Sequence, residues 1–258
     1  MQHNDAILAF QHKLGDGSIA FLVPFLDKTM DVLDVGCGPG TITIALKQYT
    51  RSAVGIDINP RVTAAAARMH AGIDRLAFVT CTMTTLPFPD AQFDAVLFHA
   101  VLYHLDPELL AATLAEARRV LKPGGLIATR DADTGGNILH PETDGLRLPL
   151  DLWMRWYEHA DSDAGRFGRR QSAMLRSHGF EPVWTGAGFV NHSADAATRQ
   201  EAVADARQSL AGMADGLIAR GLASHDDIAR AMQAWNDWGD DPDSNYLRCR
   251  CECVARRT

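Results

Sequence analysis

Short apolar runs and helical repeats alternate along the first half of the chain. Apolar runs bounded by turn residues predict four buried strands, at 32–35, 52–56, 76–80 and 93–98. Apolar positions three and four residues apart predict helices at 4–26, 41–49 and 60–70. Strands that alternate with helices are typical of a parallel sheet with helices on both faces. We therefore expect an α/β, Rossmann-like, doubly wound fold.

The second half continues this sheet and adds helices. Lys122-Pro123-Gly124-Gly125 predicts the end of a helix that begins at 108. The further predicted elements are strands at 126–129, 183–191 and 246–255, and helices at 165–178 and within 194–237. We expect seven strands in total, mostly parallel, with an antiparallel last strand at or near the sheet edge and with helical lid insertions.

Composition narrows the class of protein. The 258 residues are 47% hydrophobic and 22% charged, which is typical of a globular protein, and the net charge is −7. A negative surface argues against general binding to nucleic acids or anionic membranes. The first residues lack a charged-then-apolar signal, and no apolar run reaches membrane-spanning length. We expect a soluble, cytoplasmic protein with no nucleic-acid or membrane partner.

The stretch 31–49 passes from a strand through a glycine-rich turn into a helix. Gly36, Gly38 and Gly40 can take positive φ angles and place no Cβ between the backbone and a ligand. Pro39 is expected to hold Gly38 extended. Dinucleotide-binding proteins use the spacing G-x-G-x-x-G, whereas this loop reads G-x-G-x-G. The junction therefore predicts a ligand site but disfavours a nicotinamide dinucleotide.

The ten residues VLDVGCGPGT at 32–41 closely resemble the first motif of class I S-adenosylmethionine-dependent methyltransferases. The resemblance implies that the loop passes under the methionine and ribose of the cofactor and that Asp34 faces its amino group. It implies S-adenosyl-L-methionine as cofactor, S-adenosyl-L-homocysteine as product, and no metal. The loop contacts that it implies are Asp34, Gly36, Cys37, Gly38, Gly40 and Thr41.

Asp57 ends the second predicted strand, about 20 residues after the first glycine. A carboxylate at this point of a βαβ unit can accept both ribose hydroxyl hydrogen bonds. The alternative is a turn or helix cap before Pro60, because Asp is common in both. We favour cofactor contact by Asp57 and the neighbouring Ile58.

Residues 81–88, CTMTTLPF, resemble the family segment that typically reads G-D-A-x-x-L-P-F. Thr82 replaces the Asp that usually accepts a hydrogen bond from the adenine amino group, and a neutral hydroxyl should bind more weakly. We expect adenine contact at Thr82 and Met83. A third resemblance, RRVLKPGG at 118–125, points to the ubiquinone/menaquinone-biosynthesis-type branch.

The fourth and fifth strands end in polar side chains. Ligands bind beyond the carboxyl ends of parallel strands, so His99, Tyr103 and His104 are expected near the active face. The alternative is that a histidine satisfies local backbone groups or caps the next helix. Asp131 is the favoured carboxylate after the fifth strand, ahead of Asp133. These four residues, His99, Tyr103, His104 and Asp131, are the candidate bases, and His99 is also a candidate cofactor contact.

The helix after Gly135-Gly136 is rich in large aromatics. They are commonly core residues, but insertions after the fifth strand cover the active face in similar methyltransferases. Arg166, Arg169 and Arg170 suggest an anionic partner, or pairing with Asp161 or Asp163. The expected substrate contacts are His12, Trp153, Tyr157 and Arg170.

The sequence Cys249-Arg250-Cys251-Glu252-Cys253 resembles a metal cluster only at first sight. Alternation within a strand puts its three thiols in a row on one face, whereas zinc sites usually use C-x-x-C spacing. We expect small buried strand residues and no metal site.

Together these motifs predict one methyltransferase domain over 1–258 that acts on a small molecule. Its expected parts are an N-terminal helical cap (1–28), a cofactor-binding half (29–135), a lid insertion (136–163), the remainder of the sheet (164–193 and 244–258) and a helical insertion (194–243). The accepting atom (O, N, S or C) and the oligomeric state stay open. Alternatives are a cofactor-binding protein or cyclase-like catalyst without methyl transfer and, less favoured, an NAD-dependent oxidoreductase.

Overall fold

The structure, a computed structural model, describes residues 15–157 and 164–258. Contacts between residues divide the chain into two compact units. Unit 1 holds the described residues up to Asp131 together with Arg170–Gly186 and Glu252–Thr258. Unit 2 holds the described residues of Ala132–Arg169 together with Ala187–Cys251. Each unit is described separately below.

Unit 1 is built on a parallel sheet with the strand order β3-β2-β1-β4-β5. In the central register, Asp34 of β1 lies between Gly55 of β2 and Leu97 of β4. The carboxyl ends of β1, β2 and β4 therefore meet at one edge of the sheet. The strands are β1 (Asp31–Val35), β2 (Ser52–Asp57), β3 (Leu76–Thr80), β4 (Phe93–His99) and β5 (Leu121–Ala132).

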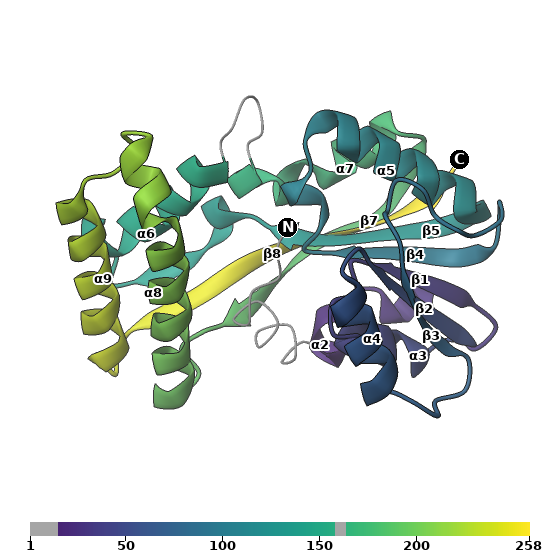
Figure 1. The fold of residues 1–258 in the computed structure, drawn as a ribbon, viewed down its shortest axis with the longest axis horizontal. Helices are drawn as coiled ribbons and strands as arrows, with labels where there is room; N and C mark the ends of the chain where they lie inside the picture. Colours follow the sequence, from purple (N-terminus) through teal and green to yellow (C-terminus); the bar gives the residue numbers. More distant parts are fainter. Residues whose placement is uncertain (1–14, 158–163) are drawn as a thin grey trace. The chain divides into compact units, whose positions relative to one another are not determined.

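Helices cover both faces of this sheet, as Figure 1 shows: α3 and α4 lie on one side, and α5 and α7 on the other. Asn59 caps α4 by accepting from the backbone N–H of Arg61, and Asp106 caps α5 by accepting from that of Leu109. The helices are α2 (Asp16–Ile19), α3 (Thr41–Lys47), α4 (Pro60–Met69), α5 (Pro107–Val120) and α7 (Gln171–Ser177), with short 3-10 helices η1 (Val23–Phe25) and η2 (Leu102–His104).

Unit 2 packs three helices around an aromatic core. Both α8 and α9 have capped N-termini. The carboxylate of Asp195 caps α8, and Ser224 and Asp227 form a reciprocal capping box at the start of α9. Figure 1 shows α8 (green) beside α9 (yellow-green). The core includes Trp235, Trp238 and Tyr246. The elements are η3 (Thr134–Gly136), β6 (Ile138–His140), α6 (Asp144–Tyr157), η4 (Ala164–Arg166), η5 (Gly168–Arg170), α8 (Ala196–Ala219) and α9 (His225–Asp240).

Strands β7 (Phe180–Asn191) and β8 (Asn245–Arg257) belong to both units in turn. β8 is antiparallel to β6 and has both β5 and β6 as sheet neighbours, while β7 also pairs with β8. The predicted α/β, mostly parallel architecture with an antiparallel last strand is confirmed. The described residues contain eight strands instead of the expected seven, and the additional strand is β6. β8 is an internal strand and does not lie at the sheet edge, where the last strand was expected.

Two further predictions need correction. Lys122-Pro123-Gly124-Gly125 does not end a helix but lies in the first part of β5, because α5 already ends at Val120. The helix predicted from 165 begins only at Gln171, and the arginine-rich stretch before it forms two 3-10 helices. Of the predicted helices at 4–26, the described residues show only α2 and η1. None of the described helices is both long and apolar enough for a bilayer.

Candidate functional site

The glycine loop after β1 is tied to the neighbouring strand. The backbone N–H groups of Gly36 and Cys37 both donate to the carbonyl of Ile56, at 2.8 Å each. Gly36, Gly38 and Gly40 have φ angles of +77°, +52° and +84°, in the left-handed region that glycine tolerates. The expected extended conformation of Gly38 is therefore wrong. Three left-handed residues fold the chain tightly between β1 and α3.

Two of these glycines make room for protein side chains. A Cβ on Gly36 would lie 2.6 Å from Cγ2 of Val101, and one on Gly40 would lie 2.6 Å from the ring of Phe78. Both distances are shorter than real contacts allow. At these two positions, the missing Cβ allows the loop to pack closely on β3 and on the segment after β4.

Asp34, the fourth residue of β1, is buried beneath the loop with 2% of its surface exposed. Thr43 donates from its hydroxyl to Oδ2 of Asp34 at 2.6 Å. Burial raises the pKa of Asp34 to about 7; the hydrogen bond from Thr43 opposes the shift, and the charge of Asp57 adds to it. An arriving cation would favour the ionised form of this carboxylate.

Asp57 ends β2 and is 4% exposed. Its Oδ2 accepts from the N–H of Gly38 at 3.2 Å, and its Oδ1 accepts from the N–H of Asn59 at 2.9 Å. The first bond joins the carboxylate to the glycine loop. The second bond closes a local turn, as the alternative interpretation of Asp57 predicted. The residue that caps the following helix is Asn59 and not Asp57. These two backbone donors hold the carboxylate in a fixed orientation at the end of β2.

The other expected cofactor contacts follow β1, β2 and β3 in the chain. Cys37 is buried, and burial strongly raises the pKa of its thiol. Ile58 is 61% exposed, which is unusual for a large apolar side chain just after a buried strand. Thr41 is the first residue of α3. The hydroxyl of Thr82 lies 3.0 Å from that of Thr84 in a local turn after β3, and the half-buried Met83 lies within that turn.

The side chains of His99 on β4, Arg130 on β5 and Glu252 on β8 form a network of polar contacts. Nη1 of Arg130 lies 3.0 Å from Nε2 of His99, and Nε of Arg130 donates to Oε1 of Glu252 at 2.8 Å. The side chains of Arg130 and Glu252 are only 5% and 10% exposed. The half-buried rings of Tyr103 and His104 lie 3.8 Å apart between centroids in η2. His99 is therefore part of a buried network.

The remaining candidates are scattered. Asp131 is completely buried at the end of unit 1, and Arg170 is exposed at the start of α7. In unit 2, Arg169 donates through its backbone N–H, Nε and Nη2 to Asp133, while Asp161 and Asp163 lie outside the described residues. His12 lies outside the described residues, and the side chains of Trp153 and Tyr157 are likewise not described.

Sequence reasoning missed three residues of this site. Thr43 lies one helical turn after the glycine loop, and its hydroxyl within the motif's own helix is a signal that could have been used. Arg130 directly precedes the candidate Asp131, and Glu252 lies between two cysteines, so neither position stands out in the sequence. Their pairing joins positions 122 residues apart, and no local pattern announces it.

The cysteine row lies in β8 as expected. Cys249 and Cys253 are buried, and Cys251 is half-buried. Burial raises the pKa of all three thiols. Among the residues that the structure describes, no group of three potential ligands is arranged to hold a metal ion.

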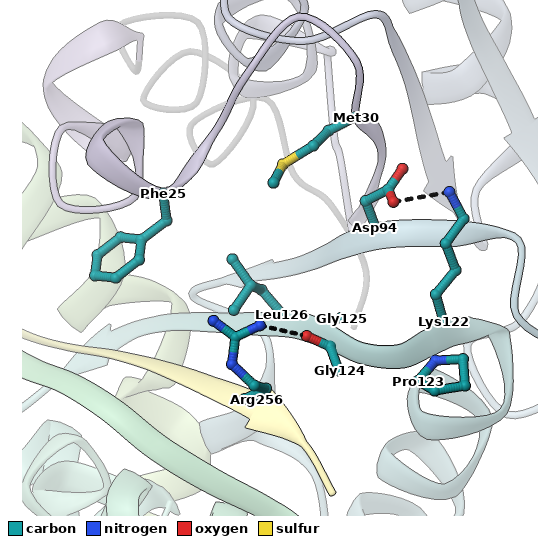
Figure 2. Close-up of a pocket in the computed structure, with 9 residues that line it drawn as sticks. All are labelled: Phe25, Met30, Asp94, Lys122, Pro123, Gly124, Gly125, Leu126 and Arg256. Atoms are coloured by element: carbon teal, nitrogen blue, oxygen red, sulfur yellow. Dashed lines mark hydrogen bonds and ion pairs between the residues drawn. The ribbon is translucent and has the colours of Figure 1, made fainter.

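A pocket of about 240 Å³ lies in unit 1 at the amino ends of β1, β4 and β5, away from the glycine loop. Figure 2 shows its two cations already engaged: Nζ of Lys122 donates to Asp94 at 2.7 Å, and Nη1 of Arg256 donates to the carbonyl of Gly124 at 2.6 Å. Phe25, Met30 and Leu126 add an apolar wall. Because both cations of this pocket already have partners and the pocket lies away from the glycine loop, we take the loop at the carboxyl ends of the strands as the candidate site.

The sequence was compared with known families and proteins. Residues 32–125 match the family described as methyltransferase domain. Over 269 aligned residues the chain is 31% identical to a protein of Aspergillus luteorubrus named probable methyltransferase ltbC. That alignment covers 95% of this chain and 92% of its relative. The similarity thus extends well beyond the loop and strands of the candidate site.

Solved structures agree at the level of the fold. A candidate methyltransferase from Bacillus halodurans C-125 superposes with a TM-score of 0.59 at 19% identity, covering 94% of this chain and all of the other. The 4+2 cyclase SpnF superposes with a TM-score of 0.55 at 22% identity, covering 99% of this chain and 85% of the other. At such identities the likeness concerns the fold alone.

Proposed function

We propose that this chain, which belongs to the class I S-adenosylmethionine-dependent methyltransferases, moves a methyl group from its cofactor to a small-molecule acceptor by direct displacement. The observation that carries the proposal is Asp57. Its buried carboxylate is oriented by one backbone N–H from the glycine loop and one from Asn59, at the carboxyl end of β2. A carboxylate held in this way is suited to two vicinal hydroxyls of a ribose.

The residues of unit 1 fit the cofactor part by part. Asp57 would bind the ribose, the loop from Gly36 to Gly40 would lie under the methionine portion, and Asp34 would face the amino group. Thr82 and Met83 would lie against the adenine. An ammonium group suits Asp34, because a positive charge offsets the burial that raises its pKa to about 7.

When bound, S-adenosylmethionine supplies a methyl group that its sulfonium already activates. The chain's task is then to hold the acceptor in line with that methyl group and to exclude water, and orientation alone can supply much of the acceleration. A base is needed only where the accepting atom carries a proton. We propose Tyr103, His104, His99 and Asp131 as candidates for this part, and His12, Trp153, Tyr157 and Arg170 as acceptor contacts.

The test of the cofactor is calorimetric titration of cofactor-stripped protein with S-adenosylhomocysteine and, separately, with a nicotinamide dinucleotide. We expect binding of the first and none of the second. Binding of the dinucleotide alone would overturn every assignment in unit 1.

The test of the reaction is incubation with methyl-labelled cofactor and a panel of small metabolites carrying hydroxyl, amine, thiol and activated carbon acceptors. Label in a metabolite supports the proposal. Tight binding of S-adenosylhomocysteine with no label transfer to any acceptor class would favour a catalyst that keeps the cofactor without methyl transfer, as a cyclase would.

A further inference from the structure

We infer that Arg130, itself fixed by Glu252, is a positioning residue that holds His99 as a neutral ring with its proton on Nδ1. The inference concerns the site treated under "Proposed function" and depends on that function only for its catalytic meaning. It narrows the part that His99 can play there, from a possible base to a hydrogen-bond donor.

The donors of Arg130 determine which nitrogen of His99 carries the proton. An arginine side chain has five N–H donors, no acceptor, and stays charged in proteins. The 3.0 Å contact between Nη1 of Arg130 and Nε2 of His99 can therefore be a hydrogen bond only if Nε2 accepts. A neutral imidazole carries one proton, and with Nε2 as acceptor that proton is on Nδ1.

Protonation of His99 would break this arrangement. Both ring nitrogens would then be donors, so Nε2–H would face an N–H of Arg130, with two positive charges side by side. Burial makes the conflict severe, because His99 is 8% and Arg130 4% exposed. The guanidinium cannot turn away without cost, because its Nε donates to Glu252 at 2.8 Å.

The surrounding backbone supports the same geometry. Ala100, directly after His99, has a φ of +57° and donates its N–H to the carbonyl of Arg130 at 2.9 Å. His99 and Arg130 are also register partners on β4 and β5. Main chain and side chain thus hold the two residues together, and Glu252 of β8 closes the network from a third strand.

The consequence for chemistry is specific. Nε2 of His99 cannot take a proton from an acceptor, so it is not the general base. Nδ1 carries the proton, so the ring can act there only as a hydrogen-bond donor. If a base is used at all, Tyr103, His104 and Asp131 remain as candidates.

The test is nitrogen-detected magnetic resonance of the full chain with ¹⁵N-labelled histidines at pH 7 and without cofactor. The His99 signals are assigned by their loss in His99→Gln. We expect the signature of a neutral ring protonated at Nδ1. A wild-type ring protonated at Nε2, or at both nitrogens, would overturn the inference without any further variant.

Variants then test the role of Arg130. The double variant Arg130→Met with Glu252→Met removes both charges of the pair, which avoids stranding one of them. We expect His99 to lose the pure Nδ1–H form in it, and to keep that form in Arg130→Lys, which retains a donor. Arg176→Met, which removes an exposed partner of Glu181 in the same unit, is the matched control and should leave His99 unchanged.

An unchanged His99 spectrum in the double variant would contradict the inference, provided that its amide spectrum shows a folded chain. If the double variant does not fold, the wild-type protonation state still decides whether the inference stands. A failure of the proposed function gives a different result: S-adenosylhomocysteine would not bind, while the spectrum of His99 would keep its Nδ1–H signature.

Discussion

Unit 1 and unit 2 use buried side chains for different ends. In unit 1, the carboxylates of Asp34 and Asp57 and the ring of His99 lie at the carboxyl ends of adjoining strands, each held by a named donor. In unit 2, the core holds edge-on rings, with the ring centroids of Trp235 and Trp238 5.3 Å apart and that of Tyr246 within 6.3 Å of both. The contrast suggests that unit 1 carries a ligand site and that these rings of unit 2 serve stability.

The largest expected effect is a loss of folding stability when the aromatic core of unit 2 is changed. Trp238 is 2% exposed and donates from Nε1 to the carbonyl of His140 at 3.1 Å. Trp238→Ala should destabilise folding by about 3–5 kcal/mol, the usual cost of removing a large buried aromatic. Denaturant unfolding measures the loss, and hydrogen exchange should place it in α8 and α9. Trp238→Phe is the control and should cost less.

An equal loss of amide protection in β1 and β4 would break the comparison, because the two units would then unfold as one. Binding of S-adenosylhomocysteine to the folded Trp238→Ala protein should remain near the wild-type value, because its assigned contacts lie in unit 1.

The next effect falls on ligand binding. Asp57→Ala removes a carboxylate that we assign to two ribose hydroxyls, and hydrogen bonds to a charged group are worth about 1.5–3 kcal/mol each. We expect S-adenosylhomocysteine affinity to fall by about 100-fold or more, and 100-fold is equivalent to about 2.7 kcal/mol. Calorimetry measures this. Asp74→Ala, which removes a carboxylate whose side chain is 91% exposed, is the control, and equal affinities of the two variants would remove Asp57 from the site.

A smaller effect separates packing from backbone strain. Gly40 and Gly72 both have a φ of +84°, but a Cβ on Gly40 would meet the ring of Phe78 at 2.6 Å, while one on Gly72 would meet nothing within 4 Å. Gly72→Ala should cost about 1–2 kcal/mol for the left-handed backbone alone.

Gly40→Ala should cost about 1–3 kcal/mol more than Gly72→Ala, because it also overpacks the loop. Unfolding by denaturant compares the two variants. If they lose the same stability, close packing is not the reason for glycine at position 40.

The last effect is a pH dependence at Asp34. Its pKa of about 7 lies above the ordinary 3.8, so between these values the folded chain binds more protons than the unfolded one. The contribution of this group to stability is therefore fully present below about pH 4 and is lost as pH rises toward 7. Unfolding curves across this range measure the trend.

Ligand binding should respond in the opposite direction. If Asp34 binds the amino group of S-adenosylhomocysteine, the ionised form is required, and affinity should fall by up to about tenfold from pH 8 to pH 6. Thr43→Val removes the hydrogen bond that opposes the shift, so it should move the midpoint to higher pH. If the affinity of the wild-type protein does not change between pH 6 and pH 8, Asp34 does not bind the amino group of the ligand.

The sequence predicted what local patterns encode. The strand, loop and helix at 31–47 follow from an apolar run, three glycines and helical spacing, and the register of Asp57 follows from the length of one βαβ unit. The strand that holds the cysteine row follows from the alternating pattern at 246–255, although burial along β8 does not alternate. In each case, the residues that determine the structure are neighbours in the chain.

What could not be predicted depends on distant residues. Glu252 and Arg130 meet because β8 lies next to β5 in the sheet, and that order is not visible in either strand's own pattern. Arg169 finds Asp133, 36 residues away, where proximity in sequence suggested Asp161 or Asp163. The helix α5 ends one residue earlier than its helical pattern suggested, and β5 begins at Leu121. Gly124 and Gly125, which the sequence placed at a helix end, therefore lie within β5.

The proximity of Asp34 and Asp57 has a consequence for turnover. The negative charge of Asp57 makes ionisation of Asp34 more costly, in addition to burial, which is the larger cause of the raised pKa of Asp34. A sulfonium cofactor brings one positive charge more than the thioether left behind after its methyl group is gone. The same pair of acids should therefore hold the reactant more firmly than the product, and loss of that charge would help to empty the site for the next cycle.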